Sequence, residues 1–512
     1  MLRTLRHIGR LFAIARTLAR HDALFFIEQG NLAPALARVA RLVARKQPGK
    51  RPGQRLAAAL EALGPSFIKL GQSLATRADL LGESVAGDLS ALHDRLPPFD
   101  SKRARKTVEE ELGGPLDRFF SSFDDKPVAA ASIAQVHFAI TSDGREVAVK
   151  ILRPDIEDAF QRDLDLFFWI GEQIERTRPD LRRFRPLAVA ETLAEWVRVE
   201  MDLRLEGAAA SELAENFMGD DDIFRVPRVD WDRTGRRVLT TERVTGIRVD
   251  DREAIVAAGL DPTEVLANAA AVFFKQVFRD GFFHADQHPG NAFVAEDGAI
   301  VAVDFGIMGR LDKKTRFFLA DMLLGFLTAD YRKVAEVHFR AGYVPQGQSM
   351  EMFTQAIRAI AEPILDKPMN EISLAKLLGL MLQVTEAFQM ETQPQLLLLQ
   401  KTMLVTEGVG RKLNPEVNMW ALARPLIEDW MRDNRGPEAR LRDAVGDITS
   451  AVERLPGLLF DLEKTMSDLA KGGLRLEDET LKDLRKSDSF GRALVYPLWI
   501  IALLLALLLF FG

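Results

Sequence analysis

The sequence predicts an α+β protein with two lobes, extra helices before, within and after these lobes, and one C-terminal transmembrane helix. Three observations lead to this prediction. Short strand-like segments are grouped in two places, long helical patterns surround both groups, and 19 consecutive uncharged residues precede the last glycine. At 512 residues the chain is also too long for one compact core, so two or three cores are expected.

The composition is that of a globular protein, and it excludes several functions. Hydrophobic residues make up 47% and charged residues 28% of the chain, the net charge is −6 and the pI is near 5.8. No overall positive field is therefore present to bind nucleic acid. The chain has no cysteine, which excludes disulfides, thiolate metal sites and a cysteine nucleophile.

Residues 1–55 form a basic amphipathic segment, with twelve Lys or Arg residues against only Asp22 and Glu28. Apolar positions near its start recur along one face, as in a helix. Three interpretations stay open: a mitochondrial presequence, an interfacial helix attracted to anionic lipid, or a solvated helical extension.

Residues 56–125 are predicted to be a helical extension. Leucine and phenylalanine recur at helical spacing over residues 56–81, and Gly64-Pro65 interrupts this pattern. Pro97-Pro98 closes the helical stretch before the first strands.

Residues 126–245 are predicted to form the smaller lobe. Residues 128–152 read as short strands, with a turn at 142–144 before the segment VAVKIL. Residues 156–215 are helical and highly charged, so we expect a helical insertion there. Two more strands are predicted within residues 226–244.

Residues 246–345 are predicted to form the larger lobe. An apolar helix over residues 262–280 is followed by the sequence HADQHPGN, a turn at 296–298 and a strand that runs into Asp304-Phe305-Gly306. Everything beyond residue 311 has a helical pattern, which makes residues 346–490 a helical C-terminal region.

Residues 493–511 are predicted to be a transmembrane helix. The run would be roughly 28 Å long, close to the thickness of a bilayer's hydrocarbon core. Tyr496 and Trp499 suit the headgroup boundary, and four basic residues between 482 and 492 precede the run. Because basic flanks stay in the cytoplasm, the rest of the chain is expected to face it. A buried core helix is the alternative, although a terminal run this apolar seldom is one.

Four residues that suit phosphoryl transfer occur in a meaningful order. Lys150 ends the strand VAVK, Asp286 and Asn291 lie five apart in the next motif, and Asp304 follows an apolar strand. A strand lysine can neutralise nucleotide phosphates, an aspartate can accept a hydroxyl proton, and Asn and Asp oxygens can hold Mg²⁺. This order predicts a two-lobed protein-kinase-like fold that binds ATP (or ADP) with Mg²⁺.

A zinc site is the competing interpretation of the same loop. His284, Asp286 and His288 form an H-x-D-x-H triplet, and His and Asp are good zinc ligands. The kinase interpretation is preferred because it also uses Lys150, Asn291 and Asp304, with both histidines then structural.

The sequence departs from ordinary kinases in three ways. Ala129, Ala130, Ala131 and Ser132 stand where a glycine-rich loop covers the phosphates, and alanine should make the loop stiffer and more helix-prone. No A-P-E segment follows the DFG at the usual distance, and a long insertion follows Lys150. These departures argue against phosphorylation of ordinary protein substrates.

Taken together, these motifs resemble those of the UbiB/ADCK (ABC1-like) family of atypical kinases, which is involved in ubiquinone biosynthesis. Lys69-Leu70-Gly71-Gln72 fits that family's KxGQ motif, and AAAS, VAVK, Glu200-x-Asp202, HADQHPGN and DFG complete the match over roughly residues 60–310. The resemblance implies a KxGQ helix that covers the peptide site, an alanine loop that alters nucleotide preference, ATPase activity, and binding of lipid or quinone precursors.

The resemblance also implies a role for each site residue. Lys150 would contact the α- and β-phosphates with Glu206 as its helix partner, Asp286 would be the base, and Asn291 and Asp304 would hold the metal. Lys69 and Gln72 would reach into the site, with Glu200 or Asp202 receiving Lys69. Glu242 and Val244 lie in a segment that resembles the hinge that binds adenine.

The predicted function is a membrane-anchored atypical kinase or ATPase that supports ubiquinone biosynthesis. Its partners would be a membrane lipid or prenylated quinone precursor and enzymes of that biosynthesis. A small-molecule or lipid kinase and a nucleotide-binding pseudokinase scaffold are the alternatives. The predicted location is a bacterial inner membrane with the rest of the chain in the cytoplasm, or alternatively the matrix side of a mitochondrial inner membrane.

Overall fold

A computed structural model describes most of the first 435 residues and divides the chain into two units, Met1–Trp430 and Met431–Gly512. Both lobes lie within the first unit. The described residues are 2–24, 49–75, 83–89, 92, 96–177, 186–220, 222–363, 384–385, 387–390, 394–417 and 419–435.

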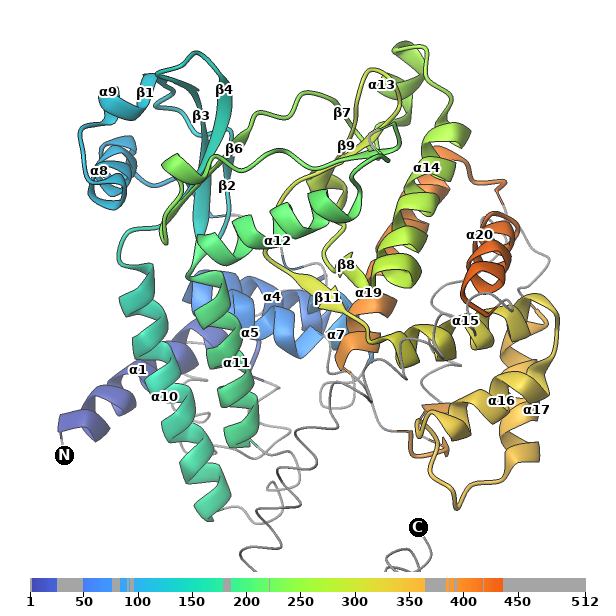
Figure 1. Cartoon of the computed structure of the whole chain (residues 1–512). Helices are drawn as coiled ribbons and strands as arrows, with labels where there is room; N and C mark the ends of the chain where they lie inside the picture. Colours follow the sequence, from blue (N-terminus) through green and yellow to red (C-terminus); the bar gives the residue numbers. More distant parts are fainter. Residues whose placement is uncertain are drawn as a thin grey trace, which may run out of the picture. The chain divides into compact units, whose positions relative to one another are not determined.

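An antiparallel sheet forms the first lobe, with the strand order β1-β3-β4-β6 and β2 paired to β3 (Figure 1). Its strands are β1 (Phe120–Phe123), β2 (Ala129–Ala130), β3 (Ala134–Thr141), β4 (Glu146–Leu152) and β6 (Val238–Glu242). Successive side chains of a strand point to opposite faces. Val147, Val149 and Ile151 therefore pack with helix α8 (Ser101–Leu112) on one face, while Lys150 points to the other.

Three helices lie between β4 and β6 in the sequence, as the predicted insertion requires. They are α10 (Ile156–Thr177), α11 (Pro186–Glu200) and α12 (Leu203–Asn216). Helix α12 begins where the carboxylate of Asp202 accepts a hydrogen bond from the N–H of Arg204, a normal N-cap. The helix packs against β6 on the sheet face that carries Lys150.

The second lobe contains a four-stranded sheet of order β5-β10-β9-β7 and a pair formed by β11 and β8. The strands are β5 (Phe224–Arg225), β7 (Ile247–Arg248), β8 (Phe282–His284), β9 (Ala292–Val294), β10 (Ile300–Ala302) and β11 (Met308–Arg310). The first of the two strands expected within residues 226–244 is reduced to β5 and a single bridge between Val229 and Thr241.

The helices of this lobe and of the C-terminal region follow largely as predicted. They are α13 (Arg252–Ala257), α14 (Pro262–Phe274), α15 (Lys313–Leu327), α16 (Tyr331–Arg340), α17 (Met350–Ala361), α19 (Pro394–Leu413) and α20 (Met419–Arg435). A π-helical turn, Lys275–Asp280, extends α14 towards β8. Helix α19 contacts both α14 and β11, so the C-terminal region reaches the centre of the second lobe.

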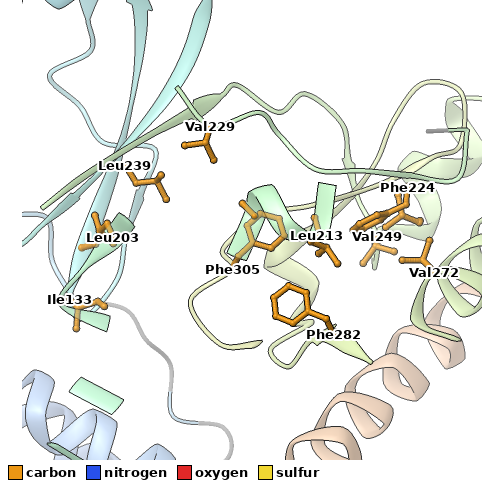
Figure 2. Packing of buried hydrophobic residues seen from close by; sticks show 14 of the residues in the cluster. Ile133, Leu203, Leu213, Phe224, Val229, Leu239, Val249, Val272, Phe282 and Phe305 are labelled. Atoms are coloured by element: carbon orange, nitrogen blue, oxygen red, sulfur yellow. The ribbon is translucent and has the colours of Figure 1, made fainter. Parts of the chain in front are cut away.

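One hydrophobic core connects the two lobes (Figure 2). Leu203 and Leu239 enter it from the first lobe, and Phe282 and Phe305 enter it from the second. Leu213, at the far end of α12, is fully buried in the same cluster. Helix α12 therefore links the strand that carries Lys150 to the segment that carries Asp304.

The N-terminal helices form a second core of their own. Helix α1 (Leu2–Arg20) packs against α4 (Pro52–Leu63) and buries Ala15, Leu18 and Ala19. Arg10 also donates two hydrogen bonds, of 3.0 and 3.2 Å, to the carboxylate of Asp163 on α10. The solvated extension considered for this segment is therefore wrong, because α1 is packed on the body of the protein.

Two further predictions about helices have different outcomes. Gly64, with φ of 105°, separates α4 from α5 (Pro65–Ala75) at the predicted break; α7 (Glu83–Leu89) and the short α9 (Leu116–Phe119) complete this region. The expectation of a helix-prone alanine loop is wrong, since Ala129 and Ala130 pair with Val136 and Gln135 in an antiparallel ladder.

The predicted transmembrane helix, residues 493–511, lies outside the residues that the structure describes. Among the helices that are described, none combines the length and the apolar character needed to cross a bilayer.

Candidate functional site

Lys150 lies at the centre of a cluster of charges between the two lobes. Its ammonium nitrogen is 2.7 and 2.9 Å from the two carboxylate oxygens of Glu206 on α12, and 2.8 Å from Oδ1 of Asp304. Strand β4, helix α12 and the segment after β10 thus supply one residue each. The structure brings together three predicted site residues that are 56 and 154 positions apart.

These three groups shift one another's protonation. Burial alone would lower the pKa of Lys150, but the carboxylates of Asp304 and Glu206 outweigh it and raise that pKa. Burial raises the pKa of Glu206 to about 6, against the opposing charge of Lys150. Desolvation would raise the pKa of Asp304 as well, but Lys150 lowers it to about 2. The cluster therefore carries a permanent positive charge and a permanent negative charge near neutral pH, with Glu206 the group closest to titrating.

Asp304 adopts a strained backbone. Its φ of 65° lies in the left-handed region, which costs a non-glycine residue roughly 1–2 kcal/mol. This conformation belongs to Asp304 and not to Gly306. A Cβ on Gly306 would lie 3.5 Å from Oδ1 of Asp304, which is an ordinary van der Waals contact. Phe305 is buried against the ring of His284 and holds the turn in place.

His284 organises the loop that carries Asp286. Its Nδ1 accepts a hydrogen bond of 3.1 Å from the N–H of Asp286, so Nε2 carries the proton and donates to the carbonyl of Val303. Burial lowers the pKa of His284 and keeps this ring neutral. The buried side chain of Gln276 accepts from the N–H of His284 at 3.0 Å. His284 thereby ties the backbone of Asp286 to the strand that leads into Asp304.

The zinc interpretation of this loop is wrong for the described residues. Both ring nitrogens of His284 are engaged in hydrogen bonds, and Nδ1 of His288 accepts from the N–H of Gly290. Across the part of the chain that the structure describes, no three His, Asp or Glu side chains gather as metal ligands. The histidines are structural elements of the loop, as the kinase interpretation requires.

Asn291 and Asp304 are suited in type to Mg²⁺. The amide nitrogen of Asn291 donates to the carbonyl of Asp286 at 3.1 Å, which leaves Oδ1 as the atom that can face a cation. Asp304 adds a carboxylate whose lowered pKa keeps it ionised. Oxygen donors of these two kinds are what Mg²⁺ prefers, so the residues fit the metal.

Lys69 makes an ion pair with Glu200, the first of the two acceptors considered. Its nitrogen is 3.0 Å from Oε1 of Glu200, and the two side chains are only 11% and 13% exposed. Asp202 instead caps α12 and bonds Arg204. Lys69 also lowers the pKa of Asp304, after the larger influence of Lys150, so α5 lies within electrostatic reach of the cluster. Gln72 is on the same helix and half-buried.

The alanine loop is held by a residue that the sequence did not indicate. The carbonyl of Ala131 accepts hydrogen bonds from Nε and Nη2 of Arg153, at 3.0 and 2.8 Å. Arg153 also donates to the carbonyl of Pro97 at 2.9 Å. Ser132 is fully buried next to this turn. One guanidinium, just beyond β4, thus fixes the loop to the segment that leads out of the N-terminal helices.

Glu242 and Val244 lie beside a cavity of about 590 Å³. Its wall includes Phe217, Phe224 and Arg225 but neither Lys150 nor Asp304. The cavity is therefore separate from the charge cluster. The structure places the expected hinge at the end of β6 but does not bring it into contact with the other site residues.

A second lysine that sequence reasoning missed contacts the predicted base. Lys401 of α19 lies with its nitrogen 2.8 Å from Oδ1 of Asp286. Thr406, on the same helix, donates to Oε1 of Gln287 at 3.2 Å. The lysine is 115 positions from its partner within a leucine-rich helical stretch, and no motif marks it.

Comparisons with known families agree with the geometry. Residues 91–338 match the model of the ABC1 atypical kinase-like domain, and residues 357–418 match that of the UbiB helical domain. The first match contains Lys150, Glu206, Asp286 and Asp304, and the second contains Lys401.

Several bacterial proteins named "Probable protein kinase UbiB" are similar over most of their length. One from Marinobacter nauticus is 40% identical over 88% of this chain and 83% of its own. One from Pseudomonas putida is 41% identical over 90% of this chain and 87% of its own, and one from Aliivibrio fischeri is 42% identical over 82% and 78%. A solved structure of Rv3197 with erythromycin, from Mycobacterium tuberculosis, matches with a TM-score of 0.52 at 24% identity, over 78% of this chain and 96% of that one. This last match shows a common fold.

Proposed function

The chain belongs to the ABC1 family of atypical kinase-like proteins, and we propose that it is a Mg-ATP-dependent kinase or ATPase that supports ubiquinone biosynthesis at a membrane. The fold is α+β and kinase-like with extra helices, and membership of the family implies ATP binding. The observation that carries the proposal is the cluster in which Lys150 joins Glu206 and Asp304, beside the loop of Asp286 that His284 ties to the same segment.

Each residue of the cluster has a role in this proposal. Lys150, positioned by Glu206, binds the α- and β-phosphates, and Asp286 accepts the proton of the attacking hydroxyl or water. Asn291 and Asp304 hold Mg²⁺, which when bound neutralises phosphate charge. The alanine loop, with Ala131 fixed by Arg153, covers the phosphates.

The proposed acceptor is small or lipid-like, and ordinary proteins are excluded. The Lys69–Glu200 pair fixes α5 against the helical insertion, within electrostatic reach of Asp304. We expect a helix in this position to limit the room for an extended peptide near Asp304. The resemblance to the UbiB/ADCK family implies a lipid quinone precursor as substrate or effector and biosynthetic enzymes as partners, and the proposal includes both.

Labelled ATP tests the proposed activity. The full-length chain in liposomes, with and without a prenylated phenol, should release inorganic phosphate with Mg²⁺ and leave an unrelated protein such as casein unlabelled. D286N should lower the rate roughly 10²-fold, as expected for a positioned base. Label in the phenol would establish the lipid-kinase alternative, and nucleotide binding without turnover would establish the scaffold. Label in casein would contradict the occlusion argument.

Flotation tests the proposed membrane anchor. The proposal places residues 493–511 in a bacterial inner membrane, with the rest of the chain on the cytoplasmic side. A chain that ends before residue 493 should lose most of its flotation with liposomes, whereas the full chain should float at high salt. Full flotation of the shortened chain at high salt would contradict this anchor.

A further inference from the structure

The pair formed by Lys401 and Asp286 joins two regions that the family models treat separately. Asp286 lies in the ABC1 domain match and Lys401 in the UbiB helical domain match, yet their charged atoms are 2.8 Å apart. Their side chains are 44% and 35% exposed, so the pair is open to a ligand. The question is therefore whether this lysine, which faces the proposed base from another domain, takes part in the reaction.

The loop of Asp286 offers no positive charge of its own. From His284 to Asn291 the sequence HADQHPGN contains neither lysine nor arginine. His288, two residues after the base, turns its Nδ1 towards the N–H of Gly290 in its own loop. Lys150 is already engaged by Glu206 and Asp304. A terminal phosphate brought to Asp286 would therefore meet a carboxylate with no lysine or arginine side chain from this loop.

Phosphoryl transfer needs positive charge at that point. Negative charge is spread over the transferred group in the transition state, and fixed cations supply much of the stabilisation. A carboxylate beside the phosphate works against this unless a cation lies between them. Lys401 is the side chain that the structure places against Asp286 and that carries the required charge.

Helix α19 is fixed firmly enough to hold this lysine in place. Val409 and Leu413 are buried in the main core, and the carbonyl of Leu413 accepts from Nε of Arg252 at 2.9 Å. Thr406 bonds Gln287, the neighbour of Asp286. The helix is thus attached to the second lobe on the C-terminal side of Lys401.

We propose that Lys401 is a catalytic residue whose ammonium group bridges Asp286 and the terminal phosphate of ATP, so that the helical C-terminal region completes the active site. The inference rests on the proposed function. In the step it serves, an oxygen of water or of a hydroxyl forms a bond to the γ-phosphorus, the bond from that phosphorus to the β–γ bridging oxygen breaks, ADP leaves, and the proton goes to Asp286. Lys401 transfers no proton and offsets the charge that develops.

The test compares K401A with K401R and with K412A in the full-length chain. Lys412 is the matched control, because it lies on the same helix and pairs with Asp250 at the same 2.8 Å, away from the loop of Asp286. K401A should lower kcat for Mg-ATP hydrolysis roughly 10²-fold with unchanged thermal stability, K401R should restore part of the rate, and K412A should match the wild type. In D286N the further change K401A should have little additional effect.

A binding measurement separates this inference from the proposed function. Calorimetric titration of K401A should show affinity for Mg-ATP reduced roughly tenfold and affinity for Mg-ADP unchanged, because only ATP carries the γ-phosphate. If the wild type binds ATP without hydrolysing it, the proposed turnover fails. The ratio of the affinities for Mg-ATP and Mg-ADP in K401A, compared with that of the wild type, then still tests Lys401. If the wild type binds neither nucleotide, both ideas fail. Three results would contradict the role of Lys401 and leave the proposed function standing. They are a K401A variant with the wild-type affinity ratio and the wild-type kcat, a K401A variant with a higher kcat, and equal losses of kcat in K401A and K412A.

Discussion

Lys150 and Lys401 make similar contacts in very different surroundings. Each places its nitrogen about 2.8 Å from a carboxylate of a kinase motif. Lys150 is only 16% exposed and Lys401 is 44% exposed; among the residues that the structure describes, Lys150 pairs with two carboxylates and Lys401 with one. Lys150 belongs to the strand at the core of the first lobe, and Lys401 to a helix added from the C-terminal region.

The difference predicts that the two lysines matter for different quantities. Breaking an enclosed ion pair leaves a charge without water or partner and costs several kcal/mol of stability. Water readily replaces an exposed partner, so an exposed pair contributes roughly 0–1 kcal/mol. Lys150 should therefore stabilise the fold and bind nucleotide, whereas Lys401 should act mainly on the rate.

The largest expected effect comes from K150A. Removal of the lysine leaves Glu206, only 9% exposed, beside the charge of Asp304. The free energy of unfolding of the solubilised full chain should fall by about 3–5 kcal/mol, mostly through Glu206, because half-exposed Asp304 is screened by water. Mg-ATP binding should be lost as well. Urea unfolding of K150A beside K401A is the measurement, and equal losses in the two variants would remove the distinction between the pairs.

The Lys69–Glu200 pair is an intermediate case. It is as enclosed as the Lys150 cluster, and it joins Lys69 on α5 to Glu200 at the end of α11. A double-mutant cycle of K69A, E200A and the double variant should give a coupling energy of about 2 kcal/mol in urea unfolding. A coupling below about 0.5 kcal/mol would show that enclosure alone does not set the strength of these pairs.

How far the sequence predicted the site depends on the range of the contacts. Lys150, Asp286, Asn291 and Asp304 were identifiable because each lies inside a short motif whose order reflects the chemistry. Glu206 was chosen by its place relative to Glu200 and Asp202, once the family resemblance implied a helix partner for Lys150. Lys401 and Arg153 act through contacts set by packing, and nothing in their neighbouring residues indicates the partner.

One local prediction failed, and one local conformation was not predicted at all. Alanine favours helix, but pairing with β3 overrides this preference at Ala129 and Ala130. The left-handed backbone of Asp304 accompanies the burial of Phe305 and the bond to Lys150, which join residues far apart in the sequence. The helices and strands were predictable from periodicity and the kinase-like fold from the order of the motifs, whereas a strained backbone is set by the assembled core.

The pH dependence of stability isolates Glu206 within the enclosed cluster. Its pKa of about 6 in the folded chain exceeds the ordinary 4.5, so the folded state binds more protons between these pH values. This contribution to stability is present below pH 4.5 and is lost as the pH rises through 6. The pKa of Asp304 is lowered to about 2, so its contribution to stability is present above pH 4 and is lost as the pH falls towards 2.

The expected measurement is a difference between wild type and E206Q. Their free energies of unfolding should diverge by about 1–2 kcal/mol between pH 4.5 and 6, with the wild type losing stability as the pH rises. Taking the difference cancels the other groups that titrate nearby, such as the buried histidines. If the difference in free energy of unfolding between wild type and E206Q stays constant from pH 4.5 to 6, Glu206 is ionised throughout this range. The charge of Lys150 would then outweigh the effect of burial on the pKa of Glu206.

The smallest expected effect concerns Arg153, which like Lys401 reaches the site from outside the motifs. Its guanidinium holds the carbonyl of Ala131 with two hydrogen bonds and that of Pro97 with another. A lysine has one nitrogen and cannot make the same fork, so R153K should loosen the alanine loop. The loss of one or two hydrogen bonds to neutral acceptors corresponds to about 1 kcal/mol. The affinity for Mg-ATP should therefore be several-fold weaker, with little change in the rate at saturation.

R145K is the matched control for R153K, since Arg145 pairs with Asp143 and Asp230. Calorimetry gives the affinity, and amide exchange at residues 131–133 reports the loop. If amide exchange becomes faster while the affinity for Mg-ATP and kcat stay at wild-type values, the alanine loop does not contact the phosphates of ATP. If kcat falls instead of affinity, Arg153 belongs with Lys401 among the residues that act on turnover.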